Sequence, residues 1–412
     1  MTLQASGTIS MGNITTEMGA ANTQTNVGGS SPRTLAAKPS GIIKWSDFYG
    51  KTAIPAYKLW VWGSEGNGQL GDNLNTGARS IPAQNLTTNA EWVSLAANTA
   101  QSAGVKADGT LWTWGYDNYG QLGIGSLVSK SSAVQTIAGG TNWKQASCGN
   151  QMMSAVKTDG TLWCWGYGAF GSMGDNTNVS KSSPVQTITG GTNWSTTAVG
   201  YSTVYGIKTD GTLWCWGRNS SGGLGDNTVV NRSSPVQTVT GGTNWSKVSS
   251  LYMHVAAIKT DGTLWLWGIN SSGQLGNGTT TNRSSPAQTV AGGTNWSQVA
   301  AGQDSTSAIK TDGTLWSWGI NTYGQLGDNT VTSKSSPVQT VAGGTTWSKV
   351  AVGSHVAAIK TDGTLWLWGQ GGFGHLGDGT LVHKSSPVQT VAGGTNWKLI
   401  ACGYRHTLAA KP

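Results

Sequence analysis

This chain of 412 residues has little charge, little cysteine and no long apolar run. Charged residues make up 10% of it and cysteine occurs four times. The cysteines fall at repeat-equivalent positions, Cys148 with Cys402 and Cys164 with Cys215, and no Cys-x-x-Cys pattern is present. We therefore expect small, half-buried side chains rather than a disulfide framework or a metal site. Because no stretch of 18 apolar residues exists, no membrane span is expected.

The beginning of the chain also lacks the marks of a secretion signal. Met1 to Ser10 has neither a basic stretch nor a continuous apolar core. We therefore expect a protein without a signal peptide that is made in the cytoplasm of a bacterial host.

Catalytic motifs are missing as well. There is no Gly-x-Ser-x-Gly elbow, no phosphate-binding loop and no pair of carboxylates that stands apart from the repeated turns. The sequence therefore predicts a protein that is not an enzyme, without catalytic residues, metal or cofactor.

What the chain does contain is a repeat. Leu-Trp-x-Trp-Gly occurs seven times, at Leu59, Leu111, Leu162, Leu213, Leu264, Leu315 and Leu365, in steps of 52, 51, 51, 51, 51 and 50 residues. A further tryptophan follows in each period, at Trp92, Trp143, Trp194, Trp245, Trp296, Trp347 and Trp397. Seven repeats of three account for 21 of the 22 tryptophans, and Trp45 is the remainder. A period near fifty built from short strand-like segments indicates a propeller or a solenoid.

One repeat reads as three or four short strands. In the repeat from Val299 to Val350, the turn signal Thr311-Asp312-Gly313 precedes a strand in which Trp316 and Trp318 share one face. Asn321 to Gly327 reads as a polar turn, and Pro337 marks the following segment as an edge strand. No amphipathic helical period is present, so the fold class is all-β.

The two ends of the chain together supply one repeat. The first Leu-Trp-x-Trp-Gly lacks the strand that precedes the others, and a matching strand occurs at Cys402 to Lys411. We therefore predict a seven-bladed β-propeller over residues 56–412, closed by a latch in which Leu408 to Lys411 pair antiparallel with Lys58 to Trp62. A short irregular N-terminal segment, residues 1–55, precedes it.

The repeat resembles that of the regulator-of-chromosome-condensation family. The resemblance rests on Asp-Gly-Thr-Leu-Trp-x-Trp-Gly, Gly-Gln-Leu-Gly, Ser-Ser-Pro-Val and Gly-x-x-His-x-x-Ala, and it covers residues 57–412. It implies a seven-bladed β-propeller. It does not imply one function, because members of that family exchange guanine nucleotides, bind chromatin or inhibit β-lactamase. The even spacing leaves no room for the long wedge-like insertion of the exchange factors.

The N-terminal segment has a different character. Leu3 to Ser10 and Ile14 to Gly19 resemble the opening of many tailed-phage structural proteins. A cluster of large apolar residues then follows, consisting of Ile42, Ile43, Trp45, Phe48 and Tyr49. We interpret this cluster as the part that docks onto other virion proteins, and the alternative is a disordered leader that tethers the propeller.

Histidines and charges repeat in register. His254, His355 and His406 share one place in three repeats, where a structural imidazole or a ring of metal ligands are the alternatives. The net charge is +8. Basic residues precede Ser-Ser at Lys130, Lys181, Arg232, Arg283, Lys334 and Lys384, and acids lie upstream at Asp72, Asp175, Asp226, Asp328 and Asp378. We expect solvated rims of opposite sign, with a basic annulus facing anionic glycan as the alternative. No nucleic acid is expected, since no aromatic residue is interleaved with these bases.

Specific recognition has to come from positions that differ between repeats. Two such bands flank the turns, one preceding Ala-Ile-Lys and one following Leu-Trp-x-Trp-Gly, and the alternative is neutral drift in exposed loops. The candidate partner-binding residues are Tyr201, Tyr252, His254, Gln303, Asp304, His355, Tyr404 and Arg405.

These observations predict a non-enzymatic phage virion structural protein of the tail, baseplate or a fibre. It would be present in several copies and display its propeller to another virion protein or to a host surface glycan or protein. The alternative is a soluble bacterial protein of the same propeller family that binds or inhibits a protein partner.

Overall fold

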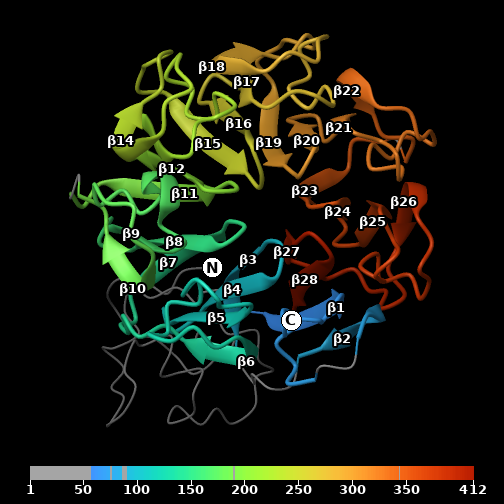
Figure 1. The fold of residues 1–412 in the computed structure, drawn as a ribbon. Coiled ribbons are helices and arrows are strands. Elements are labelled where there is room, and N and C mark those ends of the chain that lie inside the picture. Colours follow the sequence, from blue (N-terminus) through green and yellow to red (C-terminus); the bar gives the residue numbers. More distant parts are fainter. Residues whose placement is uncertain (1–56, 75–76, 86–90, 189–190, 343) are drawn as a thin grey trace, which may run out of the picture. The chain divides into compact units, whose positions relative to one another are not determined.

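The computed structural model describes residues 57–74, 77–85, 91–188, 191–342 and 344–412. They form seven four-stranded antiparallel sheets placed around a central axis (Figure 1). This confirms the predicted all-β, seven-bladed propeller. Residues 1–56 lie outside the described residues, and so do the predicted virion-docking residues Ile42, Ile43, Trp45, Phe48 and Tyr49. No helix in the described ranges has the length and apolarity needed to cross a membrane.

Each blade uses its four strands in the same way, from the axis outwards. The inner strands are β3 (Trp92–Ala97), β7 (Trp143–Cys148), β11 (Trp194–Val199), β15 (Trp245–Ser250), β19 (Trp296–Ala301), β23 (Trp347–Val352) and β27 (Leu399–Cys402). The second strands are β4 (Gln101–Lys106), β8 (Met152–Lys157), β12 (Thr203–Lys208), β16 (His254–Lys259), β20 (Ser305–Lys310), β24 (His355–Lys360) and β28 (His406–Lys411).

The outer half of each blade begins with the Leu-Trp-x-Trp-Gly motif. The third strands are β1 (Lys58–Gly63), β5 (Leu111–Gly115), β9 (Leu162–Gly166), β13 (Leu213–Gly217), β17 (Leu264–Gly268), β21 (Leu315–Gly319) and β25 (Leu365–Gly369). The outer strands are β2 (Arg79–Gln84), β6 (Lys130–Gln135), β10 (Lys181–Gln186), β14 (Arg232–Gln237), β18 (Arg283–Gln288), β22 (Lys334–Gln339) and β26 (Lys384–Gln389). One short 3₁₀ turn, η2 (Ala169–Gly171), lies between β9 and β10.

The latch closes the ring in the predicted register. In the sheet β2-β1-β28-β27, β1 and β28 pair antiparallel from Lys58 opposite Lys411 to Gly63 opposite His406. The two ends of the chain therefore share the blade that the sequence left incomplete. Tyr57 also exchanges backbone hydrogen bonds with Trp92, so the first described residue is tied to the next blade.

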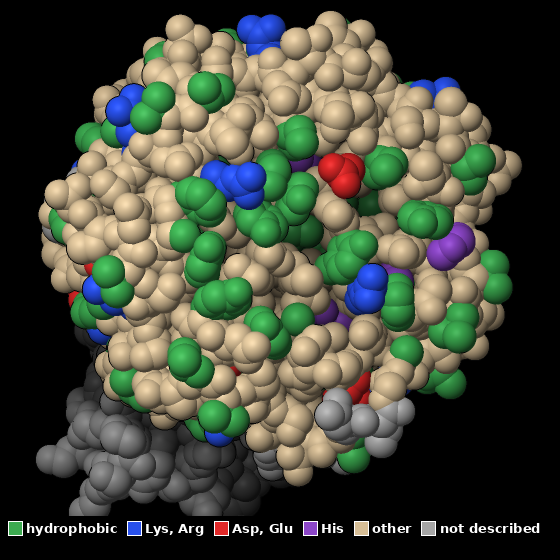
Figure 2. Space-filling view, viewed as in Figure 1, with side chains coloured by type: hydrophobic (Ala, Val, Ile, Leu, Met, Phe, Trp, Pro, Cys, Tyr) green, Lys and Arg blue, Asp and Glu red, His purple; other side chains and the backbone are tan. Residues whose placement is uncertain are grey.

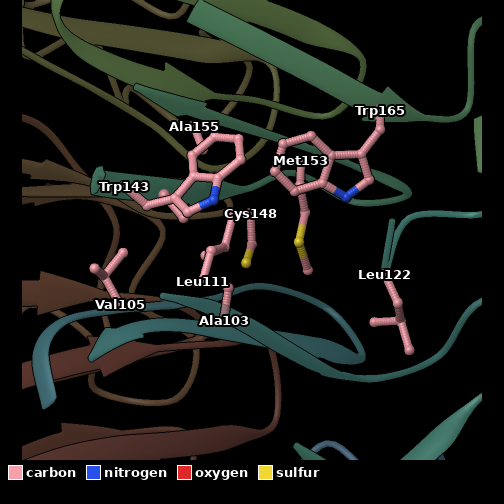
Figure 3. Close-up of a cluster of buried hydrophobic side chains, with 10 residues drawn as sticks. Ala103, Val105, Leu111, Leu122, Trp143, Cys148, Met153, Ala155 and Trp165 are labelled. Atoms are coloured by element: carbon pink, nitrogen blue, oxygen red, sulfur yellow. The ribbon is translucent and has the colours of Figure 1, made fainter. Parts of the chain in front are cut away.

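The hydrophobic core lies between neighbouring blades. In Figure 3, Val105 and Leu111 of one blade face Trp143, Met153 and Trp165 of the next. Strand alternation places both tryptophans of each motif on the same side of the strand, where the second is fully buried and the first is partly buried. A single blade buries little by itself, so each one depends on its two neighbours.

The Gly-Gln-Leu-Gly segment, predicted above only as a turn, also connects neighbouring blades. The indole Nε1 of Trp318 donates to the carbonyl of Gln274 at 2.8 Å, and the other six blades repeat this bond. Gly276 follows with a φ of +63°, and a Cβ there would lie 2.7 Å from the Trp318 Nε1. Only glycine allows the loop to approach the indole so closely.

Each blade also contains a lysine between two tryptophans. The Nζ atom of Lys310 lies 5.0 Å from the Trp296 ring and 4.7 Å from the Trp316 ring. The lysine of Ala-Ile-Lys therefore contributes cation–π attraction, about 0.5–1 kcal/mol at a partly exposed site.

Two expectations about side chains are corrected. The acidic and basic registers do not form separate rims, because members of the two registers pair within one repeat. Lys181 pairs with Asp175 at 3.3 Å, Arg232 with Asp226 at 3.0 Å and Lys384 with Asp378 at 3.3 Å, and Asp72 of the acidic register pairs with Arg79 at 2.6 Å. The four cysteines are free and fully buried rather than half-buried, and burial raises the pKa of their thiols.

Candidate functional site

The two variable bands meet on one face of the propeller. Ser305 at the start of β20 pairs with Gly319 at the end of β21, so the turn before β20 and the loop after β21 lie side by side. The Thr-Asp-Gly turns join the other ends of these strands and form the opposite face. Figure 2 shows a face with few acidic side chains and with hydrophobic side chains around a central hollow. We call the face that carries both bands the variable face.

The axis of the ring contains a neutral channel of about 360 Å³, lined by the seven inner strands. None of its lining side chains is charged; they are mainly alanine, serine and valine, with leucine, isoleucine, threonine, glutamine and cysteine. At the variable face the side chain of Asn98 crosses the mouth of the channel, because its Nδ2 donates to the carbonyls of Cys148 at 2.9 Å and Leu251 at 3.3 Å. The channel lining therefore contains hydroxyl, amide and thiol groups but no acidic or basic side chain.

One part of the variable face is an aromatic group built around an arginine. The rings of Tyr201 and Tyr252 meet edge to face at 5.3 Å. The guanidinium of Arg218 lies 5.4 Å from the Tyr201 ring and 5.4 Å from the Phe170 ring, and its Nε donates to Ser220 at 3.1 Å. These residues come from three blades, so a partner that touches them would span several repeats.

A second group repeats this chemistry at the latch blade. The guanidinium of Arg405 lies 4.2 Å from the Phe373 ring and 5.0 Å from the Tyr404 ring. Nearby, Tyr323 packs against His383 with ring centroids 4.6 Å apart. Aromatic and arginine side chains of this kind supply most of the energy in protein interfaces.

Between these groups lies a recess of about 150 Å³. Its lining residues are Gln303, Asp304, Ser305, Ile320, Tyr323, Gln325, Gly353, Ser354, Gln370 and Tyr404. Asp304 is the acid in this lining, and burial raises the pKa of its carboxyl. Among the residues that the structure describes, its carboxylate accepts one long side-chain hydrogen bond, from the Gln274 Nε2 at 3.5 Å. We call this feature the Asp304 recess.

The structure removes His254 and His355 from the candidate partner-binding residues. Both side chains are fully buried, and each His Nε2 bonds a hydroxyl of the next blade, Thr306 at 2.9 Å and Thr407 at 2.7 Å. The hydroxyl of Thr306 donates onward to the carbonyl of Gln274, so the imidazole must be the donor to it. These histidines are therefore structural, and burial lowers their pKa values. In the described part of the chain, no three histidine, cysteine or acidic side chains gather as a metal site.

The other candidates all lie on the variable face. Gln303, Asp304 and Tyr404 line one recess, Tyr201 and Tyr252 pack together, and Arg405 stacks beside Tyr404. The candidate list missed Arg218, Tyr323 and Phe373, although these residues belong to the second variable band. Their importance depends on which blades become neighbours, which the spacing of the repeats implies only once the ring is closed.

Comparison with known proteins supports the same architecture. A family model described as an RCC1-like domain matches residues 58–410. The ultraviolet-B receptor UVR8 of Arabidopsis thaliana is 31% identical over 287 residues, which cover 68% of this chain and 64% of the receptor. The RCC1 domain-containing mitochondrial protein RUG3 of the same plant is 27% identical, with 68% and 70% covered.

The chain spans less of other relatives, for example 24% of the X-linked retinitis pigmentosa GTPase regulator homolog of Caenorhabditis elegans. Among solved structures, human WBSCR16 has a TM-score of 0.76 at 21% identity, covering 86% of this chain and 99% of the other. Yeast RCC1 (Prp20), in its complex with Kap60, has a TM-score of 0.77 at 18% identity, covering 86% and 89%. The structural likeness shows the fold, and the match over residues 58–410 shows that this chain belongs to the family of proteins with an RCC1-like domain.

Proposed function

We propose that this protein is a non-enzymatic binding propeller that recognises a protein partner through its variable face. The proposal rests on one observation: repeated positions make the contacts that hold the ring together, whereas variable positions gather on one face. The repeated tryptophans, lysines and glycines are engaged in contacts within and between blades, as for Trp318, Lys310 and Gly276. The variable positions instead gather tyrosine, phenylalanine and arginine side chains on one face.

The relatives support a protein as the class of partner. Yeast RCC1 was solved bound to Kap60, and another study of the same yeast protein describes its binding to Gsp1p and histones. A protein partner also suits the chemistry of the face, since rigid aromatic rings and arginines bury large areas at a low cost in conformational entropy.

The proposal is tested by substitution at the variable face. Cross-linking and affinity purification from the native host would be compared for the full chain and for the Tyr201→Ala, Tyr252→Ala and Arg405→Ala variants. We expect each variant to lose the same specific partner while its melting temperature stays within a few degrees. Matched controls are Val239→Ser and Val341→Ser, which alter half-exposed residues that follow outer strands. If the variable-face variants keep the partner, or if the control variants lose it as well, the proposal is wrong.

The virion setting is a second part of the proposal and rests on the sequence of residues 1–55, with the apolar cluster Ile42 to Tyr49 as the docking element. A chain that begins at Pro55 should fold as a ring but be missing from particles when it replaces the full chain. Normal incorporation of that chain into particles would reject the virion role. A specific partner found in a bacterium that carries no particles would favour the alternative, a soluble inhibitor or binding protein.

A further inference from the structure

The Asp304 recess lies at the one short turn among the described inner turns. Between Ala301 and its partner Thr306 the chain has four residues, and the same number separates Val199 from Val204 and Cys402 from Thr407. Between Val352 and Val356 it has three. This deletion is the source of the last, 50-residue step in the repeat. The shortened turn contributes Gly353 and Ser354 to the wall of the recess, where other blades carry one more residue.

Neutral side chains surround a single carboxylate in the recess. It contains amide, hydroxyl and phenol groups, one isoleucine, and the carboxylate of Asp304, but no cationic side chain. Tyr323 and Tyr404 supply aromatic rings at the recess, and π-faces attract cations.

Asp304 is also the one acid in the two variable bands that is not fully buried, since Glu65 is 1% exposed and Asp117 has no exposed surface. No ion pair to Asp304 occurs among the residues that the structure describes, where the four ion pairs belong to the outer loops. The two arginines of the same face are stacked on aromatic rings rather than turned to this carboxylate. Half-burial without a cation is costly for a carboxylate, and a cation from outside would relieve that cost.

We propose that the Asp304 recess binds the guanidinium group of an arginine side chain presented by the partner protein. A planar guanidinium can donate two parallel hydrogen bonds to the carboxylate while its face stacks on a tyrosine ring, and the glutamine carbonyls and the Ser354 hydroxyl accept its remaining N–H groups. A lysine ammonium, as a point charge, would use fewer of these acceptors. This inference rests on the proposed function and names the chemistry that one part of that surface recognises.

The test uses a small probe, so that it does not depend on finding the partner. N-acetyl-L-arginine methylamide would be titrated into the full chain and followed by protein-detected NMR shifts and by saturation transfer to the probe. The citrulline analogue, which has nearly the same shape without the charge, serves as the neutral comparison. We expect saturable binding of the arginine probe, at least tenfold weaker binding of the citrulline probe, and shifts confined to the recess.

Two variants locate the site. Asp304→Asn should weaken the arginine probe at least tenfold. Insertion of one glutamine between Gly353 and Ser354 restores the turn length of the neighbouring blades and should abolish binding while the ring stays folded. The matched control is Asp328→Asn, which removes the same charge from an outer loop where another repeat already carries Asn277 with the same hydrogen bonds. It should bind the probe like the unaltered protein.

Several outcomes would overturn the inference: equal binding of both probes, unchanged binding by Asp304→Asn, or saturable binding of methyl β-glucoside in place of the arginine probe, which would make the recess a sugar site. The two proposals fail separately. If only the arginine inference is wrong, partner capture still depends on Tyr201 and Tyr252. If the proposed function is wrong, partner capture survives the Tyr201→Ala and Tyr252→Ala substitutions.

Discussion

At the scale of single residues, the second position after Leu-Trp-x-Trp-Gly contains asparagine in some repeats and a titratable aspartate in another. Asn321 donates from Nδ2 to Asp328 and to two carbonyls, and its Oδ1 accepts from Leu326. Asp117 holds this position in another repeat. Its Oδ1 accepts from Leu122, but its Oδ2 is buried without a hydrogen-bond partner. Burial raises the pKa of the Asp117 carboxyl to about 7.

We predict that Asp117→Asn stabilises the protein by about 1–3 kcal/mol above pH 8, because the amide can make the bonds that the carboxylate cannot. The folded aspartate titrates near 7 and the unfolded one near 3.8, so the folded state holds the extra proton between these values. Stability therefore falls as pH rises from about 4 to 7 and is lowest above it. Urea midpoints at pH 5 and 8.5 test this. Equal differences between variant and unaltered protein at both pH values would contradict it.

The buried histidines have the opposite dependence. His254, His375 and His406 are buried, and burial lowers the pKa of each to about 3. An unfolded histidine takes up its proton near 6.5, so the unfolded state holds more protons between pH 6.5 and 3. Stability due to these groups is fully present above 6.5 and is lost as pH falls.

We predict that His254→Gln lowers stability at pH 7 by about 1–2 kcal/mol but makes it fall less steeply between pH 6.5 and 4. The amide can still donate to Thr306, and it takes up no proton on unfolding. Thermal melts at pH 4.5 and 7 measure both effects. The control is His383→Gln, a histidine in an outer loop that packs on Tyr323. If His254→Gln and His383→Gln change the loss of stability between pH 6.5 and 4 equally, burial of His254 does not cause that loss.

At the scale of elements, the loop after each third strand determines how closely two blades approach. The Gly-x-Leu-Gly loop brings a carbonyl to the indole of the next blade, and that carbonyl also accepts a hydroxyl, as Gln274 does from Trp318 and Thr306. The approach requires glycine for two reasons, the positive φ and the contact with the indole ring. The cost of the positive φ and the cost of the indole contact can be separated, because other glycines have a positive φ without any close contact.

We predict that Gly276→Ala costs about 2–4 kcal/mol, since the new methyl group meets the Trp318 indole as well as an unfavourable φ. Gly292→Ala is the matched control. Its φ is +52° and a Cβ there has no atom within 4 Å, so only the backbone term of about 1–2 kcal/mol remains. Denaturant midpoints of the two variants provide the comparison. Equal losses would mean that the loop and Trp318 do not constrain each other.

The elements also show what sequence reasoning reaches and what it does not. The blade count and the register of Lys58 with Lys411 follow from counting repeats and noting which strand is missing. The role of Gln274 does not, because its partner Trp318 lies 44 residues away and no local pattern links the two. For the same reason the sequence alone does not decide between a structural and a binding role for His254, since its partner Thr306 belongs to the next blade. The 50-residue step is apparent in the sequence, but the recess that the shortened turn helps to form depends on how neighbouring blades pack.

At the scale of the whole molecule, the propeller separates stability from recognition by placing them on different parts of the ring. Contacts between blades involve repeated residues, and the variable face lies where the inner turns and outer loops meet. The Thr-Asp-Gly turns form the other face, and each is a regular hairpin, as in Lys310 N to Thr314 O at 3.0 Å. Because β28 and β1 are paired in the same way without such a turn, the position of the chain ends is one of seven equivalent choices.

We therefore predict that a circular permutant folds into the same ring. Starting from the chain of Tyr57 to Pro412, Lys411 would be joined to Leu59 through Thr-Asp-Gly-Thr, and new ends would be opened between Asp312 and Gly313. The new hairpin has the register of its siblings, where Ile309 lies opposite Leu315, so backbone geometry needs no change. We expect a melting temperature within about 5 °C of the linear chain, since one hairpin turn replaces another. The Asp304 recess should keep its affinity for the arginine probe, because the joined and opened turns both lie on the opposite face. A permutant that unfolds, or that folds and loses the recess, would show that the latch blade differs from the other six.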